Sequence, residues 1–340
     1  MRGHRWTRRP EGSNWGEFGP DDQLGRMNLL TPERRLRAIR EVTQGLVFTL
    51  SLPLDFPGGN ALFEYRKPPR FFHERRGSGH NYNFTLSNVS PSFSDVVCDE
   101  AVLLYSQYST QWDGLSHVGQ MFDADGDGVA EKVYYNGYRG GSDIVGPDDA
   151  AEPSGASALG IDNLAAAGVQ GRGVLVDLER RFGRRRAVVG HDELRRALDE
   201  QGAVVDPGDF LCLYTGFADL LLEMARKPDR EVLAASCAVL DGRDERLLKW
   251  ITDSGLVAIC ADNFAVEAYP ARPGTGERHP ALPLHNHCLF KLGIHLGELW
   301  YFAELARWLR QAGRWSFLLT APPLRLPGAV GSPVTPVATV

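Results

Sequence analysis

The 340-residue sequence predicts a single α/β domain. In its second half, short apolar runs typical of buried strands alternate with amphipathic segments typical of helices, and this order favours mixed α/β packing. No low-complexity linker and no internal repeat divides the chain, so one domain is expected. Hydrophobic residues make up 43% and charged residues 24% of the sequence, as in an ordinary globular protein.

The folded part is expected to span residues 13–340, after a loose basic segment at residues 1–12. Residues 31–33, Thr-Pro-Glu, are typical of a helix start, with Thr31 as the N-cap, and predict a helix to about residue 43. Residues 54–95 are rich in proline, glycine and aromatic side chains without a regular period. A long segment of this kind predicts a lid or a contact between subunits; a meandering surface excursion is the alternative.

A continuous apolar run at residues 101–105 predicts a buried strand. It leads into the polar sequence QYSTQWDGLSH at residues 107–117. Because many α/β proteins carry their sites where strands end, this segment is the first candidate for a functional site. A polar loop that only caps the strand is the alternative.

The aspartates at residues 123, 125 and 127 imitate the first half of a calcium loop. Tyr134 occupies the position where an EF-hand needs its glutamate, so we expect a hairpin turn there. Residues 47–52 alternate and predict a strand near the N-terminus. Further along the chain, strands are expected at residues 173–177, 209–215, 256–260 and 315–320, and helices at residues 191–201, 244–254 and 301–311.

Composition excludes several classes of protein. The net charge of −6 argues against binding to nucleic acid or to an anionic membrane surface. Five scattered cysteines without a CxxC pair predict reduced thiols rather than a disulfide framework. The basic N-terminus lacks the apolar stretch of a secretory signal, and no apolar run has the length of a transmembrane helix. A cytoplasmic protein with a small-molecule substrate is expected.

The sequence resembles the cyclase family, which includes bacterial kynurenine formamidases and isatin hydrolases. Four separated blocks carry the resemblance: NWG…LTPE near the N-terminus, QYSTQWDGLSH, LHNHCLFKLGIHLGEL and the GSP segment of the tail. The family motif HxGTHxDxPxH places Gln107 and Gln111 at its first two histidines, Asp113 at its aspartate and His117 at its last histidine. The resemblance implies a swivelling β/α fold with a mixed barrel-like sheet, and a homodimer or homotetramer.

The resemblance also implies a metal site. In the family, the motif aspartate bridges two metals, and a distant histidine and glutamate complete one of the two positions. Here Asp113, His285 and Glu298 are the implied ligands of one divalent ion, zinc or manganese. The other position, at Gln107 and Gln111, is expected to be empty, because an amide is a poor substitute for imidazole. His287 and His295 are the rivals of His285 as the histidine ligand.

The implied activity is hydrolysis of a C–N bond in an amide, formamide or lactam, or of an ester or lactone, by metal-activated water. His117 would act as the general acid or base beside Asp113. The side chains expected to contact the substrate are Gln107, Thr110, Gln111, Trp112 and Tyr135. Two alternatives stay open: a metal-free cyclase or dehydratase that uses His117 with Asp113, and a non-catalytic member of the family that binds a small molecule.

Overall fold

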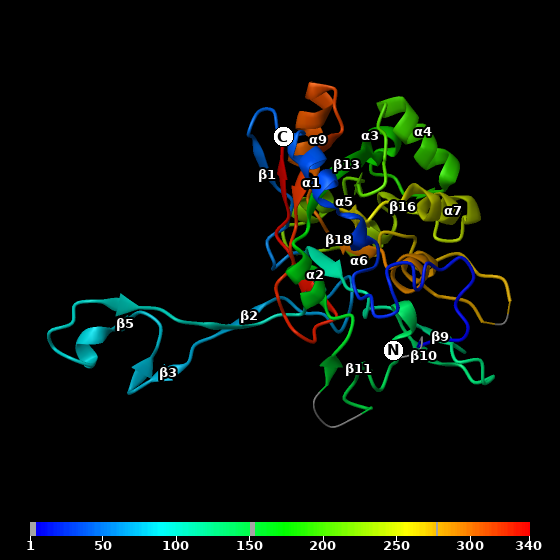
Figure 1. Ribbon diagram of the computed structural model, residues 1–340. Helices are drawn as coiled ribbons and strands as arrows, with labels where there is room; N and C mark the ends of the chain where they lie inside the picture. Colours follow the sequence, from blue (N-terminus) through cyan, green and yellow to red (C-terminus); the bar gives the residue numbers. More distant parts are fainter. Residues whose placement is uncertain (1–4, 150–153, 277) are drawn as a thin grey trace.

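The computed structural model describes residues 5–149, 154–276 and 278–340. Its centre is a nine-stranded mixed sheet with the strand order β1-β21-β19-β13-β15-β17-β18-β8-β20. The inner strands β13, β15, β17 and β18 run parallel, and the remaining neighbours pair antiparallel. The sheet curls into a half-barrel, which confirms the predicted α/β fold with a mixed barrel-like sheet (Figure 1).

Three of the four parallel strands form where the sequence predicts strands, and the fourth, β18, is not among the predicted strands. The four are β13 (Gln170–Asp177), β15 (Phe210–Tyr214), β17 (Ala258–Ala261) and β18 (His295–Glu298). Their side chains alternate between two apolar clusters: Leu211 and Leu213 enter one, whereas Phe210 and Cys212 enter the other. The sheet is therefore buried on both faces, as expected of a largely parallel sheet.

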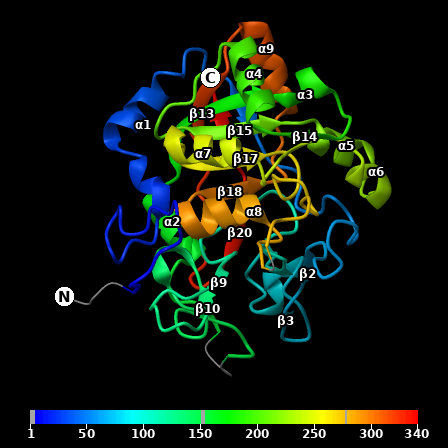
Figure 2. The same ribbon diagram turned by 90° about the vertical axis from the view of Figure 1, so that its right-hand side faces the viewer.

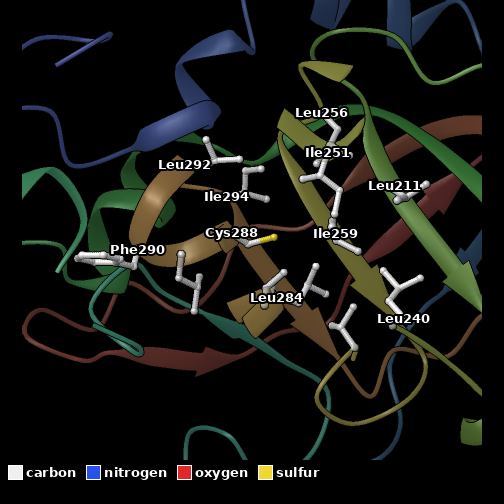
Figure 3. Close-up of a cluster of buried hydrophobic side chains, with 14 of the residues drawn as sticks. Leu211, Leu240, Ile251, Leu256, Ile259, Leu284, Cys288, Phe290, Leu292 and Ile294 are labelled. Atoms are coloured by element: carbon white, nitrogen blue, oxygen red, sulfur yellow. The ribbon is translucent and has the colours of Figure 1, made fainter. Parts of the chain in front are cut away.

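Helices cover both faces of the sheet (Figure 2). On one face lie α4 (His191–Gln201), α7 (Glu245–Ser254), the short α8 (Pro283–His285) and the π-helical η4 (Asn286–Leu292). Figure 3 shows this packing: Ile251 of α7 and Cys288 of η4 meet Leu211 and Ile259 of the strands. On the other face, α2 (Ile161–Ala167) and α9 (Ala303–Ala312) pack against the sheet.

The edges of the sheet come from chain segments far apart in sequence. β1 (Val47–Thr49) pairs with β21 (Val337–Thr339), which pairs with β19 (Ser316–Thr320). The other edge is β20 (Gly331–Pro333), which pairs with β8 (Gln111–Asp113). The C-terminal tail thus supplies one strand near each edge of the sheet.

The N-terminal part partly follows the sequence prediction. Helix α1 (Pro32–Ile39) begins after Thr31, whose side chain accepts a hydrogen bond from the Arg34 N–H, but it ends four residues before the predicted boundary. Residues 5–12, predicted to be loose, contact the hairpin that follows the polar motif. The backbone N–H groups of Thr7 and Arg8 both donate to Ala124 O.

The Asp-rich sequence forms the predicted hairpin. Strands β9 (Gln120–Phe122) and β10 (Glu131–Val133) pair antiparallel around it. The Asp123 carboxylate accepts hydrogen bonds from the backbone N–H groups of Gly126 and Gly128. These contacts explain the local pattern of aspartate and glycine as turn chemistry.

The prediction of a buried strand at residues 101–105 is wrong. Strand β7 (Ala101–Leu103) is exposed and pairs only with β2 (Arg70–Phe72). Both belong to residues 65–105, called the arm here, which project from the body (Figure 1). The rest of the arm contains β3 (Arg75–Arg76), β4 (Gly79–His80), β5 (Phe84–Thr85), η2 (Leu86–Asn88) and β6 (Val96–Val97). An apolar run in the sequence does not reveal whether another helix or sheet packs over the strand it forms.

The remaining elements are peripheral or connect the layers. They are η1 (Gly25–Leu29), η3 (Tyr135–Gly137), β11 (Ile144–Val145), β12 (Gly155–Ala156), α3 (Leu178–Phe182), β14 (Ala187–Val189), α5 (Phe217–Glu223), α6 (Arg230–Ala234) and β16 (Ala238–Leu240). Among residues 5–149, 154–276 and 278–340, none of the helices has the length and apolar character that crossing a bilayer requires. All five cysteines are free thiols, and only Cys98 is exposed.

Candidate metal centre

The polar motif forms strand β8, which lies between β18 and β20. In the register, Gln111 lies opposite Glu298 and Asp113 opposite Leu296. Directly opposed residues of an antiparallel pair project from the same face. The side chains of Gln111, Asp113 and Glu298 therefore share one face of the sheet, and that of Trp112 projects from the other.

His285, at the end of α8, completes a buried cluster with Asp113 and Glu298. Its Nε2 atom lies 3.3 Å from Glu298 Oε1 and 3.9 Å from Asp113 Oδ2. One ligand atom from each of the three residues lies within 4.8 Å of the others, and all three residues are buried. The structure thus brings together the three predicted ligands, which are separated by up to 185 positions in sequence.

Glu267 orients the histidine of this cluster. Its Oε1 atom accepts hydrogen bonds from His285 Nδ1 at 2.8 Å and from the His285 backbone N at 3.0 Å, and its Oε2 atom accepts from the Leu284 N–H. Because Nδ1 donates to a carboxylate, Nε2 is left to face Asp113 and Glu298. A carboxylate behind a histidine is the usual arrangement when that histidine binds a metal.

The cluster holds an excess of buried negative charge. Burial disfavours a charged imidazole, but hydrogen bonds with Glu267 and Glu298 outweigh it and raise the pKa of His285 to about 10. Burial raises the pKa of Asp113. Burial also opposes ionisation of Glu298, yet its contact with His285 lowers its pKa overall. Three carboxyl groups around one imidazole favour a further cation.

The donor set fits a divalent metal ion. Within the described part of the chain, Asp113 Oδ2 is buried and has no hydrogen-bond partner. A buried acceptor of this kind is costly unless something binds it. Two carboxylates and one imidazole are a donor set that zinc and manganese accept.

Gln111 occupies the space between the two candidate carboxylate ligands. Its Nε2 atom donates to Asp113 Oδ1 and to Glu298 Oε2, both at 3.2 Å. Its Oε1 atom is buried and without a hydrogen-bond partner in the described structure. In this arrangement, the amide steadies the two carboxylates rather than pointing its donors at a substrate.

His117 lies at the solvent side of the cluster. Its Nε2 atom is 3.8 Å from Asp113 Oδ1, and its Nδ1 atom is 3.5 Å from Gln107 Nε2. The side chain is 22% exposed, in contrast to the 1% of Asp113. A ring with one nitrogen at the cluster and partial access to solvent is suitably placed to exchange protons.

Three residues predicted to contact the substrate face elsewhere. The Thr110 hydroxyl accepts from the Leu52 N–H and donates to Leu299 O. The Trp112 Nε1–H donates to Ala321 O in the apolar cluster on the far face of the sheet. Tyr135 is fully buried, and its hydroxyl donates to an Asp22 oxygen. These side chains link parts of the fold, so direct contact with a substrate at the centre is not expected.

Neither of the two rival histidines belongs to the cluster. His287 Nε2 donates to Leu248 O at 2.9 Å, on helix α7. Burial lowers the pKa of His295 to about 3, and its Nδ1 atom has no partner among the described residues. His285 is therefore the histidine of the HNH sequence that joins Asp113 and Glu298.

Sequence reasoning missed two residues of the centre. Glu267 follows Ala265 and Val266, which both have positive φ, so its placement depends on an irregular loop. Arg66, at the base of the arm, donates to Gln107 O at 2.8 Å, and its positive charge acts to lower the pKa values of Asp113 and Glu298. A lone Glu after apolar residues and a lone Arg in a basic stretch carry no sequence signal for these roles.

A cavity of about 560 Å³ lies beside the segments that carry His117 and His285. Its wall includes Val118 and Met121, just after His117, and Leu282, just before His285. Asn286 and Gln120 meet at this wall through a hydrogen bond of 2.8 Å. A mainly apolar cavity of this size with a few polar groups is typical of small-molecule sites.

The fold and the buried cluster define an α/β protein with a candidate metal centre at the edge of a curled mixed sheet. The Cyclase family model matches residues 48–268, which is more than half of the chain. The protein belongs to the cyclase family.

Solved structures agree with this assignment. A crystal structure described as a novel cyclase shares 32% sequence identity with this protein, at a TM-score of 0.74. The similarity covers 96% of this chain and 97% of the other chain. Isatin hydrolase A from Labrenzia aggregata, bound to benzyl benzoate, shares the fold at 12% identity, with 86% and 93% of the two chains covered and a TM-score of 0.53. An isatin hydrolase bound to the product analogue thioisatinate is similar at 13% identity, 91% and 99% coverage and a TM-score of 0.52. No curated protein sequence matches the chain significantly.

Proposed function

We propose that the protein is a metal-dependent hydrolase that cleaves a C–N bond in an amide, formamide or lactam, or the corresponding bond of an ester or lactone. The observation that carries the proposal is the buried cluster of Asp113, His285 and Glu298, in which Asp113 Oδ2 has no partner among the described residues. Membership of a family whose structural relatives include isatin hydrolases supports it.

Asp113, His285 and Glu298 would hold one zinc or manganese ion. When bound, such an ion supplies Lewis-acid chemistry, in which it activates water and polarises a carbonyl oxygen. Glu267 fixes the ring of His285 and so keeps Nε2 directed at the ion site. The two glutamines leave only these three ligands, so a single ion is expected.

His117 would move the proton that hydrolysis requires. Gln107 lies against its Nδ1 atom, which leaves Nε2 directed at the cluster. There the imidazole can accept a proton from the attacking water and return it to the leaving nitrogen or oxygen. Its partial exposure allows the proton to be exchanged with solvent between turnovers.

The neighbouring cavity would take the organic part of the substrate. Val118, Met121 and Leu282 present apolar surface there, Gln120 and Asn286 add amide groups, and Arg278 and His279 add basic side chains. The cavity therefore suits a compact substrate with an apolar body and a polar or acidic group to orient it. Its wall begins at Val118, directly after His117, so a substrate held there would lie near the proposed acid or base.

Metal analysis combined with turnover assays tests the proposal. We expect protein purified without added metal to retain about one equivalent of a divalent ion. A panel of amides, formamides, lactams and lactones should then reveal hydrolysis. Asp113→Asn should lose both the ion and the activity, whereas Asp199→Asn, a change of the same kind at an exposed aspartate of α4, should retain both.

Other outcomes support the two alternatives instead. Turnover without bound metal that disappears in His117→Ala would indicate a metal-free cyclase or dehydratase based on the pair of His117 and Asp113, which lie 3.8 Å apart. Binding of small molecules with neither metal nor turnover would indicate a non-catalytic member of the family. Either result would overturn the hydrolase proposal.

A further inference from the structure

A second cavity, of about 770 Å³, adjoins the cavity beside His117. The two cavities share the residues Arg278, His279, Pro280 and Asn286. The second cavity is otherwise lined by residues 241–246 at the start of α7, by residues 272–275 of the loop that precedes α8, and by Lys291 of η4. It is called the basic cavity here, because of the charges on its wall.

The wall of the basic cavity carries more positive than negative charge. Its basic side chains are Arg243, Arg246, Arg272, Arg278 and Lys291, and its acidic side chains are Asp241, Asp244 and Glu245. Arg246 pairs with Asp192 outside the cavity, and Arg272 pairs with Asp241. Asp244 is the N-cap of α7 and accepts hydrogen bonds from backbone N–H groups of that helix. Three cations, Arg243, Arg278 and Lys291, therefore remain with Glu245 as the one carboxylate on the described wall to offset them.

Arg243 is the best-fixed of these three cations. The side chain is half-buried, and its guanidinium donates to two main-chain carbonyl oxygens, Arg272 O at 3.0 Å and Pro280 O at 2.6 Å. No carboxylate pairs with it among the residues that the structure describes. Carbonyl oxygens satisfy N–H donors without neutralising the charge, and a partly buried charge of this kind favours a nearby counter-ion.

The loop before α8 holds Arg243 in place before any ligand arrives. Gly274 lies so close to this side chain that an added Cβ atom would come within 2.9 Å of Arg243 Cζ and 2.5 Å of His279 Cγ. The backbone of the loop thus packs directly against the guanidinium, on the side chain that it also binds through Arg272 O and Pro280 O. A cation fixed in this way loses little conformational entropy when it binds a ligand.

We propose that the basic cavity binds the anionic group, a carboxylate or a phosphate, of a small molecule through Arg243, Arg278 and Lys291. A planar guanidinium presents paired N–H donors that match both anions, and a lysine adds a point charge. The cavity has the volume typical of sites for organic ligands, so the anionic group is expected to belong to an organic molecule. The inference does not depend on the proposed hydrolysis.

Two kinds of molecule could present such a group. One lies wholly within the basic cavity. The other spans both cavities, with its apolar part against Val118, Met121 and Leu282 of the neighbouring cavity and its anionic group at the shared wall. Inorganic phosphate and phenyl phosphate distinguish the two, because they carry the same anionic group and only phenyl phosphate has an apolar ring.

Calorimetric titration of the full chain with inorganic phosphate tests the site itself, at low ionic strength to limit screening. We expect saturable binding that is at least tenfold weaker in Arg243→Gln. The double variant Arg278→Gln, Lys291→Gln should also bind at least tenfold more weakly, and it leaves the hydrogen bonds of Arg243 to the loop intact. The control Arg195→Gln, at an exposed arginine of α4, should bind phosphate as the wild-type protein does.

The same titration after removal of metal with a chelator separates this site from the candidate metal centre, since phosphate also binds metal ions. We expect the phosphate affinity to be unchanged. Circular dichroism of each variant shows whether it is folded. No saturable binding, binding that persists in both the single and the double variant, a control that loses affinity, or binding that disappears with the metal would each overturn the inference.

Phenyl phosphate then identifies the kind of ligand. An affinity at least tenfold above that of inorganic phosphate, with the gain lost in Met121→Asp, would assign the anionic group to a molecule that spans both cavities. Met121 is 56% exposed on β9, so this substitution should leave the fold intact. An affinity within tenfold of that of inorganic phosphate would assign a ligand that lies wholly within the basic cavity.

Discussion

Glu267 holds His285 at two points, the ring Nδ1 at 2.8 Å and the backbone N at 3.0 Å. One carboxylate oxygen thus fixes both the start of the π-helical segment and the rotation of the imidazole. The sequence distance between the two residues is 18 positions, across a loop with two residues of positive φ. The candidate metal centre therefore depends on a residue that is not itself a candidate ligand.

Removal of this carboxylate should weaken metal binding without removing a ligand. In Glu267→Ala we expect a 10- to 100-fold lower metal affinity, the usual effect of losing the group behind a ligating histidine. Glu267→Gln should lose less metal affinity than Glu267→Ala, because the amide oxygen of glutamine can still accept a hydrogen bond from His285 Nδ1. Competition with a chelator measures the affinity. An affinity unchanged in Glu267→Ala, as in the exposed control Glu231→Ala, would contradict the prediction.

The glutamines at the motif positions should determine how many metal ions bind. The double variant Gln107→His, Gln111→His supplies two imidazoles beside Asp113, and imidazole binds zinc far better than a neutral amide does. We expect the zinc content to rise from about one to about two equivalents per chain. Elemental analysis after dialysis measures it. A content that stays at one equivalent would show that these side chains cannot reach a second ion.

His117 should affect turnover but not metal content. In His117→Gln we expect kcat to fall by about 10²- to 10⁴-fold, the usual contribution of a general acid or base. The bound metal should remain, because His117 is not among the candidate ligands. The variant His191→Gln, at a histidine distant in the fold, serves as the control. Loss of metal along with activity would instead indicate that His117 is a ligand.

Stability should decrease in mild acid because His295 is held neutral. Burial lowers its pKa to about 3, whereas an unfolded histidine titrates near 6.5. Between these values the unfolded chain binds the proton and the folded chain does not. The contribution of neutral His295 to the unfolding free energy is therefore complete above pH 6.5 and is lost as the pH falls toward 3. His295 should account for about 2 kcal/mol of the loss between pH 7 and pH 5.

Urea denaturation at a series of pH values measures this contribution. Between pH 7 and pH 5, the unfolding free energy of His295→Leu should fall by about 2 kcal/mol less than that of the wild-type protein. An unchanged pH dependence in the variant would mean that His295 is protonated in the folded protein or that its environment changes with pH.

Gly331 should be needed for the tail strand to lie against the motif strand. A Cβ atom there would come within 2.5 Å of Gln107 Nε2 and 2.9 Å of Trp112 O. We expect Gly331→Ala to lower the unfolding free energy by about 1–3 kcal/mol, the usual cost of overpacking. It should also lower turnover, because Gln107 contacts His117. In the control Gly146→Ala, the new Cβ meets only the Asp149 side chain, so thermal unfolding should be unchanged.

The sequence by itself determined the regular body of the fold. Helix α4 at His191–Gln201 and the strands β13, β15 and β17 lie where apolar periodicity and capping residues predict them. These signals are local, because each element buries one face and its ends need particular residues. The resemblance to the cyclase family also gave the three candidate ligands, which the structure brings together.

Only the tertiary structure decided which side chains share a space. The apolar run at residues 101–105 is exposed because no layer covers the arm, and Trp112 faces away from the centre because strand alternation points it into the core. Glu267 and Arg66 reach the centre through an irregular loop and the base of the arm. Periodicity records whether a residue prefers to be buried, but contacts between distant segments depend on sheet register and loop geometry. Neither of these is encoded in a short window of sequence.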